Sequence, residues 1–176
     1  MKRSFLVLTL ILMWIGLVFY FSSQPPDVSG RQSGNVYKFL KKVDNVLDFT
    51  QTRWYKNLRS LLEKWWFPDK KPTGEDLVRK SAHFGLYFIM GILSFVFSYT
   101  YLRKYVFSIL MGTSLPTLIA VLDEYNQIFH NRGSSLYDVF IDMNGALFGV
   151  VIALLTLVVV RLITRAYNVR RGGGIV

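Results

Sequence analysis

The sequence predicts an all-α polytopic membrane protein, a four-helix transmembrane bundle with a long outer loop that contains amphipathic helices. Of its 176 residues, 52% are hydrophobic, and they gather in long unbroken runs rather than at the spacing of a soluble core. The net charge of +10 is typical of contact with nucleic acid or with an anionic membrane. The hydrophobic runs favour the membrane, and we identify no nucleic-acid-binding motif. The chain has no cysteine, which excludes disulfides and thiolate chemistry.

Four apolar runs approach the roughly 17–25 residues that cross a bilayer as a helix. They cover about 4–21, 84–102, 106–122 and 139–160, and they predict one membrane domain over residues 1–176. The first run has an alternative interpretation as a cleaved signal peptide, because Lys2 and Arg3 precede it. It is longer than the apolar region of a typical signal peptide, so we favour a retained anchor.

The basic residues near the span ends predict the orientation. The side that holds both termini carries eight Lys and Arg and no acid. The other side carries six basic residues, counted within about 15 residues of a span end. Because Lys and Arg are enriched in cytoplasmic loops, we expect both termini in the cytoplasm and residues 22–80 and 123–138 outside. The eight are Lys2, Arg3, Arg103, Lys104, Arg161, Arg165, Arg170 and Arg171, and the six are Arg31, Lys70, Lys71, Arg79, Lys80 and Arg132.

The loop over residues 22–80 is predicted to contain one or two amphipathic helices. Apolar residues recur at helical spacing from Val36 to Leu47 and from Trp54 to Trp65, with Lys and Arg between them. We expect these helices to form a cap that packs on the bundle. The alternative is a basic collar that contacts anionic lipid or wall polymer.

Hydrogen-bonding and ionisable side chains collect at the predicted outer ends of all four spans. Singly, each has an ordinary explanation: Asp138 could cap a helix, and His83 could be an interface residue. One shared site accounts for all of them together, because ionisable groups at this depth are costly without a role. We therefore predict a ligand-binding polar cluster. Its candidate members are Ser22, Gln24, Lys80, His83, Tyr87, Asp123, Glu124, Gln127, Arg132, Asp138 and Asp142.

The start of the fourth span indicates which of its faces is buried. Asp138, Asp142, Gly145 and Gly149 recur at steps of three and four, so they share a helix face. Small residues allow helices to approach closely, so we predict that the two glycines pack against a neighbouring helix and that Asp142 points inward. Within the cluster, we expect Arg132 to tie the acids together, because its fork can bind two carboxylates.

Three stretches of the sequence carry a family resemblance. "FSSQP" follows the first span, "RKSAHFGLYFIMGIL" lies in the second, and "DEYNQIFHNRGSSLYDVFIDMNGALFG" joins the third to the fourth. They resemble the VanZ-like family, small multi-span membrane proteins of bacteria whose name comes from teicoplanin resistance. The resemblance covers the four spans and their outer ends, but not the basic loop.

The resemblance also implies a set of motif residues. This sequence departs from the family pattern at Asn126, Gly85 and Asp142, where the family often has His, an acid and Asn. The first two departures weaken a mechanism built on a full set of His and carboxylates. The implied motif residues are Ser22, Ser23, Gln24, Lys80, His83, Tyr87, Asp123, Glu124, Gln127, Arg132, Asp138 and Gly145.

Two classes of function fit these observations. In the first, a protein of the bacterial cell membrane binds an envelope lipid, a lipid-linked precursor or a glycopeptide-type ligand, and so affects glycopeptide tolerance. The alternative is a membrane-embedded, metal-assisted enzyme acting on a lipid headgroup. Asp123, Glu124 or Asp142 would then hold a divalent metal, with His83 as the general base. The sequence has no nucleophile motif and no metal-spacing motif, so we favour binding and identify no cofactor. A transporter is a third, weaker interpretation.

Overall fold

The computed structural model describes residues 2–68 and 71–172, so Lys70, one of the basic residues counted above, lies outside the described residues. Within these ranges the chain is helical, with no strand. The helices are α1 (Lys2–Ser22), α2 (Pro26–Leu47), the short 3-10 helix η1 (Phe49–Gln51), α3 (Arg53–Trp66), α4 (Gly74–Leu102), α5 (Tyr105–Phe129) and α6 (Leu136–Gly172).

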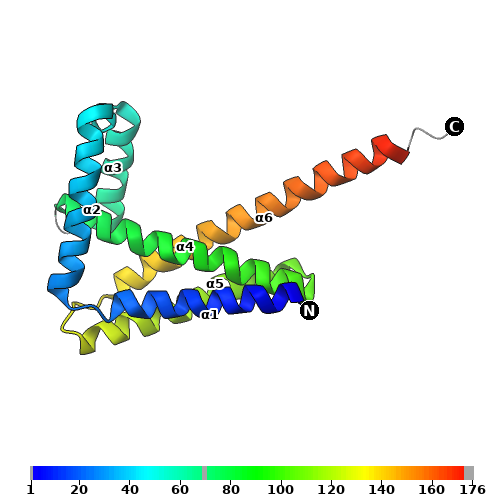
Figure 1. Ribbon diagram of the computed structural model, residues 1–176, viewed down its shortest axis with the longest axis horizontal. Coiled ribbons are helices and arrows are strands. Elements are labelled where there is room, and N and C mark those ends of the chain that lie inside the picture. Colours follow the sequence, from blue (N-terminus) through cyan, green and yellow to red (C-terminus); the bar gives the residue numbers. More distant parts are fainter. Residues whose placement is uncertain (1, 69–70, 173–176) are drawn as a thin grey trace.

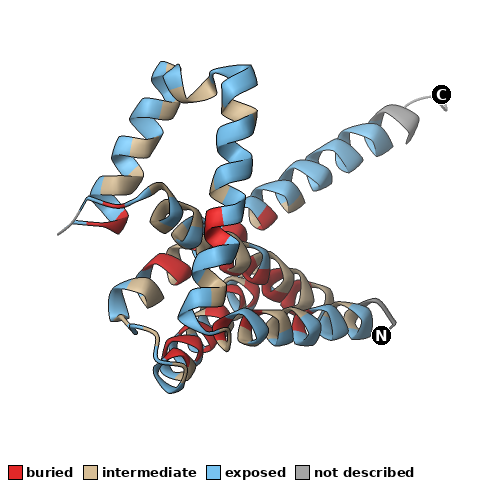
Figure 2. Cartoon of the chain, turned by 60° about the vertical axis from the view of Figure 1, so that its left-hand side comes forward, coloured by how far each residue is buried: buried red, intermediate tan, exposed pale blue. Residues whose placement is uncertain are grey.

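Four of these helices are long and apolar enough to cross a membrane: α1, α4, α5 and α6. The prediction of an all-α polytopic membrane protein is therefore confirmed. In Figure 1, α1, α4 and α5 run alongside one another, and α6 crosses them at a slant before its C-terminal part projects away. The buried residues gather where these four helices meet (Figure 2). The core clusters are Val18, Tyr87, Met90, Ile119 and Ala120, then Phe95, Tyr99, Val150 and Ala153.

Helix α4 begins well before the predicted start of its span near residue 84. A capping box fixes this start, because Thr73 Oγ1 accepts from the Asp76 backbone N–H and the Asp76 carboxylate accepts from the Thr73 N–H. Its 29 residues make a helix of about 43 Å. The hydrocarbon core is about 30 Å thick, so α4 is longer than a span requires, and its acidic first turn with Glu75 and Asp76 is suited to headgroup depth.

Glycines let α6 approach α4 closely. A Cβ atom at Gly145 would lie 2.5 Å from the carbonyl oxygen of Phe84, and one at Gly149 would lie closer still to that of Phe88. Real side chains do not tolerate such contacts, so the two helices cross with backbone against backbone. Asp142, one turn before Gly145, is thereby carried to the inner face, where it is 1% exposed.

Helices α2 and α3 form a hairpin that stands across the direction of the spans in Figure 1. At its corner, the Thr50 hydroxyl and backbone N–H donate to Asp44, and these hydrogen bonds hold the pKa of Asp44 below its ordinary value. The predicted cap on the bundle is wrong for most of the apolar stripe. Its exposed members are Val36, Phe39, Leu40, Val46, Leu47, Trp54, Leu58, Leu61 and Trp65. A hairpin of this kind suits the interface plane of a bilayer.

Candidate functional site

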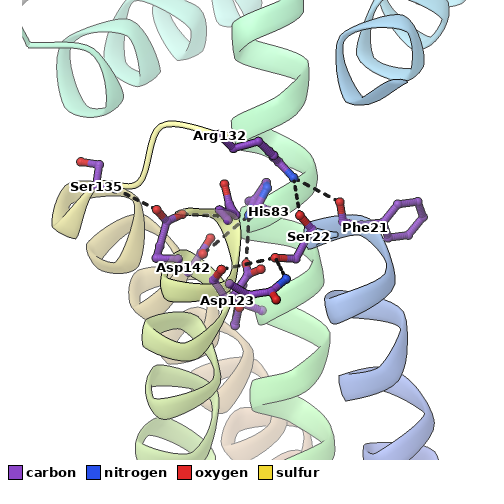
Figure 3. A network of polar contacts seen from close by, with 11 residues as sticks. Phe21, Ser22, His83, Asp123, Arg132, Ser135 and Asp142 are labelled. Atoms are coloured by element: carbon purple, nitrogen blue, oxygen red, sulfur yellow. Dashed lines mark hydrogen bonds and ion pairs between the residues drawn. The ribbon is translucent and has the colours of Figure 1, made fainter. Parts of the chain in front are cut away.

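The candidate site lies where the end of α1, the start of α4, the end of α5 and the start of α6 meet, and we name this region the polar end of the bundle (Figure 3). The α5–α6 connection shapes it. Asn131 adopts a left-handed conformation at φ 54°, which Asn tolerates better than most residues. The Gln127 carbonyl oxygen accepts from the backbone N–H groups of His130 and Arg132, so the chain turns back over the end of α5.

His83 stands between two buried aspartates, one from α5 and one from α6 (Figure 3). Its Nδ1 lies 3.8 Å from Oδ2 of Asp123 and 3.6 Å from Oδ2 of Asp142. The Tyr87 hydroxyl donates to Asp123 Oδ2 at 3.2 Å. Oδ1 of Asp123 and both oxygens of Asp142 have no hydrogen-bond partner among the described residues. The three side chains can bring ligand atoms within 4.8 Å of one another, so they form a group that could hold a metal ion.

Arg132 does not tie the carboxylates together, and that part of the prediction is wrong. Its Nη1 donates to the carbonyl oxygens of Phe21 and Ser22, at 3.1 and 3.2 Å (Figure 3). Within the described residues, it forms no ion pair within 4.0 Å of a carboxylate. The last carbonyls of α1 lack partners in their own helix and carry partial negative charge, so they attract the cation. Burial lowers the pKa of Arg132, but a guanidinium keeps its charge at neutral pH.

Glu124 fastens the loop that follows α5. Its Oε1 accepts from Gln127 Nε2 at 3.1 Å, and its Oε2 accepts from the Ser135 backbone N–H at 2.8 Å. Both carboxylate oxygens are therefore engaged by neighbouring groups. Glu124 and Gln127 lie at the candidate site, but their contacts are those of residues that position the loop.

Lys80 and Asp138 form an ion pair with an N–O distance of 2.8 Å. The Lys80 ammonium also donates to the Trp66 carbonyl oxygen at 2.9 Å and lies 4.4 Å from the centroid of the Phe67 ring. One side chain thus connects the end of α3 to α4 and α6. Lys80 has close partners on three sides, whereas three of the four carboxylate oxygens of the aspartates beside His83 accept no hydrogen bond from the described residues.

Hydrogen bonds from α5 hold the end of α1. The Asn126 amide donates to the hydroxyls of Ser22 and Ser23, at 3.0 and 3.1 Å, and the Ser22 hydroxyl donates to the Asp123 carbonyl oxygen at 3.3 Å. Gln24 is not brought into the cluster, because its amide turns back to a carbonyl of α1.

Two cavities meet at the polar end. The first, of about 200 Å³, is lined by both charged and polar groups of α4, α5, α6 and the α5–α6 connection. The second, of about 1130 Å³, is an apolar groove between the α2–α3 hairpin and the helices α1 and α4. The two cavities share the lining residues Ser29, Arg79, His83 and Arg132. The polar cavity and the apolar groove are therefore adjacent, and these four residues line both of them.

Sequence reasoning missed several residues of this region. Arg79 lines both cavities, and its place beside Lys80 at the start of a helix was the available signal. Asn126 was noted only as a departure from the family pattern, yet it fastens α1 to α5. Ser29 lines both cavities, and the Ser135 backbone N–H donates to Glu124. Both are brought to the site by the tertiary fold, which no local sequence pattern predicts.

Comparison with known proteins supports the resemblance seen in the sequence. The family model described as VanZ/LLP1 matches residues 5–159, a range that includes all the motif residues and the long loop. No curated protein and no solved structure gives a significant match. The matched range takes in every helix that builds the polar end, and the chain belongs to the VanZ/LLP1 family.

Proposed function

We propose that this membrane protein binds an envelope lipid whose headgroup carries a phosphate, and that this binding affects glycopeptide tolerance. The observation that carries the proposal is that the polar cavity adjoins the apolar groove, because Ser29, Arg79, His83 and Arg132 line both. A ligand that fills both must be polar at one end and apolar at the other. A phospholipid and a lipid-linked wall precursor share this chemistry.

Among the cationic side chains that line the polar cavity, Arg132 is the one best placed to bind an anionic headgroup. Lys80 is paired with Asp138 at 2.8 Å, and Arg79 lies 3.6 Å from Asp76. Among the described residues, Arg132 donates to backbone carbonyls through Nη1 alone, which leaves Nε and Nη2 to bind phosphate oxygens. A guanidinium fork matches the geometry of a phosphate, so Arg132 is the residue that we assign to the headgroup.

The apolar groove supports a hydrocarbon chain as the second half of the ligand. Its walls include Val36 and Leu40 of α2 and Leu86 and Ile89 of α4. The first turns of α4 are suited to headgroup depth, as argued from its length and its acidic start. A lipid in this position would enter sideways from the bilayer, with its headgroup beside Arg132 and its chain between the hairpin and α4.

The proposal places the polar end on the outer face of a bacterial cell membrane, with both termini in the cytoplasm. It rests on the distribution of Lys and Arg and on the name of the family, which comes from teicoplanin resistance. A protein that holds a precursor lipid at this face would change how much of that lipid a glycopeptide meets. Reporter fusions after Arg171 should report cytoplasm, and fusions within residues 30–70 should report the outside. A cytoplasmic signal from the loop would contradict this placement.

Lipid binding is tested on the full chain in detergent by native mass spectrometry. The probes are phosphatidylglycerol, undecaprenyl phosphate, diacylglycerol without a phosphate, and teicoplanin. We expect the two phosphate-bearing lipids to bind and diacylglycerol to bind weakly. Undecaprenyl phosphate above phosphatidylglycerol would identify the precursor class. Binding of teicoplanin alone, or equal binding of diacylglycerol, would overturn the proposal.

Arg132→Gln is the variant for this test, and Arg31→Gln is its matched control. Arg31 is an exposed arginine on α2 whose partner is Asp27, away from both cavities. Loss of a charged phosphate contact costs about 1.5–3 kcal/mol, so Arg132→Gln should weaken lipid binding at least about tenfold and reduce glycopeptide tolerance at equal membrane abundance. Equal tolerance in cells that express Arg132→Gln and Arg31→Gln would contradict the link to the drug.

The alternative function, a metal-assisted enzyme acting on a lipid headgroup, is favoured by one observation. His83, Asp123 and Asp142 stand together beside the same cavity. In this alternative, Asp123 and Asp142 would hold the metal and His83 would be the general base rather than a ligand. A water would attack the terminal phosphorus, His83 would receive its proton, and the P–O bond would break with undecaprenyl phosphate as the leaving group. Release of inorganic phosphate from undecaprenyl pyrophosphate would support this function. Lipid binding without phosphate release, with Mn²⁺ or Zn²⁺ present, would leave binding as the function.

A further inference from the structure

We infer that His83, Asp123 and Asp142 bind a divalent transition-metal ion at the floor of the polar cavity. The inference goes beyond the proposed lipid binding and stands without it, because the three side chains belong to the protein alone. They come from α4, α5 and α6, three helices that pack closely against one another through glycines, and this packing fixes the positions of the side chains.

The distances suit coordination to one ion. Ligand atoms bound at about 2.0–2.2 Å from a metal lie roughly 3–4 Å from one another. His83 Nδ1 is 3.8 Å from Asp123 Oδ2 and 3.6 Å from Asp142 Oδ2. All three residues can offer atoms within 4.8 Å of each other. A cation between them therefore needs little movement of the side chains.

The buried oxygens without partners are the second, independent observation. Asp123 and Asp142 are each 1% exposed, and three of their four carboxylate oxygens accept no hydrogen bond from the described residues. A buried carboxylate in that condition is costly unless a proton or a cation compensates it. A protonated His83 would bring one positive charge to two carboxylates, and at 3.6–3.8 Å it still leaves those oxygens without hydrogen bonds.

Neighbouring residues distinguish this group from an ordinary acidic cluster. Glu124 has both oxygens engaged, and Asp138 is paired with Lys80, so neither is free to coordinate. Tyr87 donates to Asp123 Oδ2, as an outer partner does when it orients a ligating carboxylate. The structure thus separates Glu124 and Asp138, whose oxygens are engaged by neighbouring donors, from Asp123 and Asp142, which keep buried oxygens without hydrogen bonds.

The donor set indicates the class of metal. Imidazole nitrogen suits Zn²⁺ and other transition metals, whereas carboxylates also suit Mn²⁺ and Mg²⁺. One imidazole with two carboxylates therefore favours Mn²⁺ or Zn²⁺ over Ca²⁺. Three protein ligands leave coordination positions open, and His83 and Asp142 both line the polar cavity. If the proposed lipid binding holds, a phosphate oxygen could occupy an open position beside Arg132.

The test is metal binding by tag-free, full-length protein in detergent, without lipid. After chelation and dialysis, the protein should take up one Mn²⁺ or Zn²⁺ per chain. The Mn²⁺ form should show nitrogen hyperfine coupling by pulsed electron paramagnetic resonance, and His83→Gln should remove that coupling. Asp142→Asn and Asp123→Asn should each weaken the affinity at least about tenfold, as even outer partners cost that much.

Glu124→Gln and Asp138→Asn are the matched controls, because they remove nearby acids that the structure shows to be engaged. Both should keep the stoichiometry and affinity of the unaltered protein. Each variant is scored only if its elution from gel filtration matches that of the unaltered protein, and a variant that fails is replaced by the corresponding Ala variant. No bound metal, no nitrogen coupling, or equal weakening by the control variants would overturn the inference. Metal binding without lipid binding would leave this site in place and reject the proposed function alone.

Discussion

The two ends of the same helix bundle satisfy their charges in opposite ways. At the end away from the hairpin, Arg161 donates to the hydroxyls of Tyr99 and Tyr105 and lies over both rings, 5.3 and 5.2 Å from their centroids. Arg103 lies 5.9 Å from the Tyr99 ring centroid. We name this region the aromatic end. Its cations are matched by aromatic side chains of the protein, an arrangement that stabilises helix ends.

At the polar end, several charged groups lack a full set of hydrogen-bond or ion-pair partners among the described residues. Asp123 and Asp142 are buried without a full set of partners, and Arg132 has no carboxylate partner within the described residues. Helices α4, α5 and α6 thus share in one end where Arg161 binds aromatic side chains of the protein, and in one end that leaves buried carboxylate oxygens without hydrogen bonds from the described residues. This difference is our reason for proposing that the polar end is a site, because natural proteins rarely keep such groups without a role.

The largest expected effect comes from separating the helices that support both ends. Gly149→Ala places a Cβ against the Phe88 carbonyl oxygen, whereas a Cβ at Gly85 meets nothing within 4 Å. Overpacking of this kind costs about 1–3 kcal/mol, so thermal unfolding in detergent should occur at a lower temperature for Gly149→Ala. Gly85→Ala is the matched control and should not lower it. Equal melting of the two variants would show that α4 and α6 do not cross through Gly149.

Removing the ion pair between Lys80 and Asp138 at the polar end should have a smaller effect on stability. Lys80 binds Asp138 and the Trp66 carbonyl oxygen while it is 14% exposed. Because the pair is partly open to solvent, a double-mutant cycle of Lys80→Met and Asp138→Asn should give a coupling energy of about 1 kcal/mol. A coupling near zero would mean that this corner is held by the packing around Trp66 and Phe67 instead.

The aromatic end should respond in stability alone. Arg161→Lys keeps the charge but loses the planar fork that reaches both tyrosine hydroxyls. We expect a loss of about 0.5–1 kcal/mol in unfolding free energy, with lipid and metal binding unchanged. Weakened ligand binding in a folded Arg161→Lys protein would break the distinction between the two ends.

The sequence predicted the four spans, because an apolar run long enough to cross a bilayer rarely forms anything but a transmembrane helix. It gave the apolar span near residue 84 but not the start of α4 at Gly74, although Thr73 and Asp76 carry the spacing of a capping box and could have located it. The role of Arg132 was wrong for a different reason. The prediction considered only charged side chains as partners of Arg132. Its partners are backbone carbonyls at the end of α1, and every residue has a backbone carbonyl, so the sequence could not single them out.

For the site residues, the sequence predicted the burial of Asp142 but not the pairing of the acids. Helical spacing with Gly145 and Gly149 predicted that Asp142 points inward, and the structure buries it against α4. Which acids are paired and which are not depends on the rotation of three helices about one another. Nothing in the sequence distinguishes Asp138 and Glu124 from Asp123 and Asp142. The structure does, because Asp138 and Glu124 are engaged by neighbouring donors, whereas Asp123 and Asp142 keep oxygens without hydrogen bonds from the described residues.

The most direct test of the polar end as a site, rather than as scaffold, is the melting temperature of Asp142→Asn in chelated, lipid-free protein. Asp142 accepts no hydrogen bond from the described residues, and its contact with His83 Nδ1 is as long as 3.6 Å. Removing this buried charge relieves a desolvation cost, so melting should stay unchanged or rise. Asp138→Asn, one turn earlier on α6 and paired with Lys80, is the control and should melt roughly 2–4 °C lower for each 1 kcal/mol lost. If Asp142→Asn melts as much lower as Asp138→Asn, the carboxylate supports the fold, and the account of the polar end as an incomplete site is wrong.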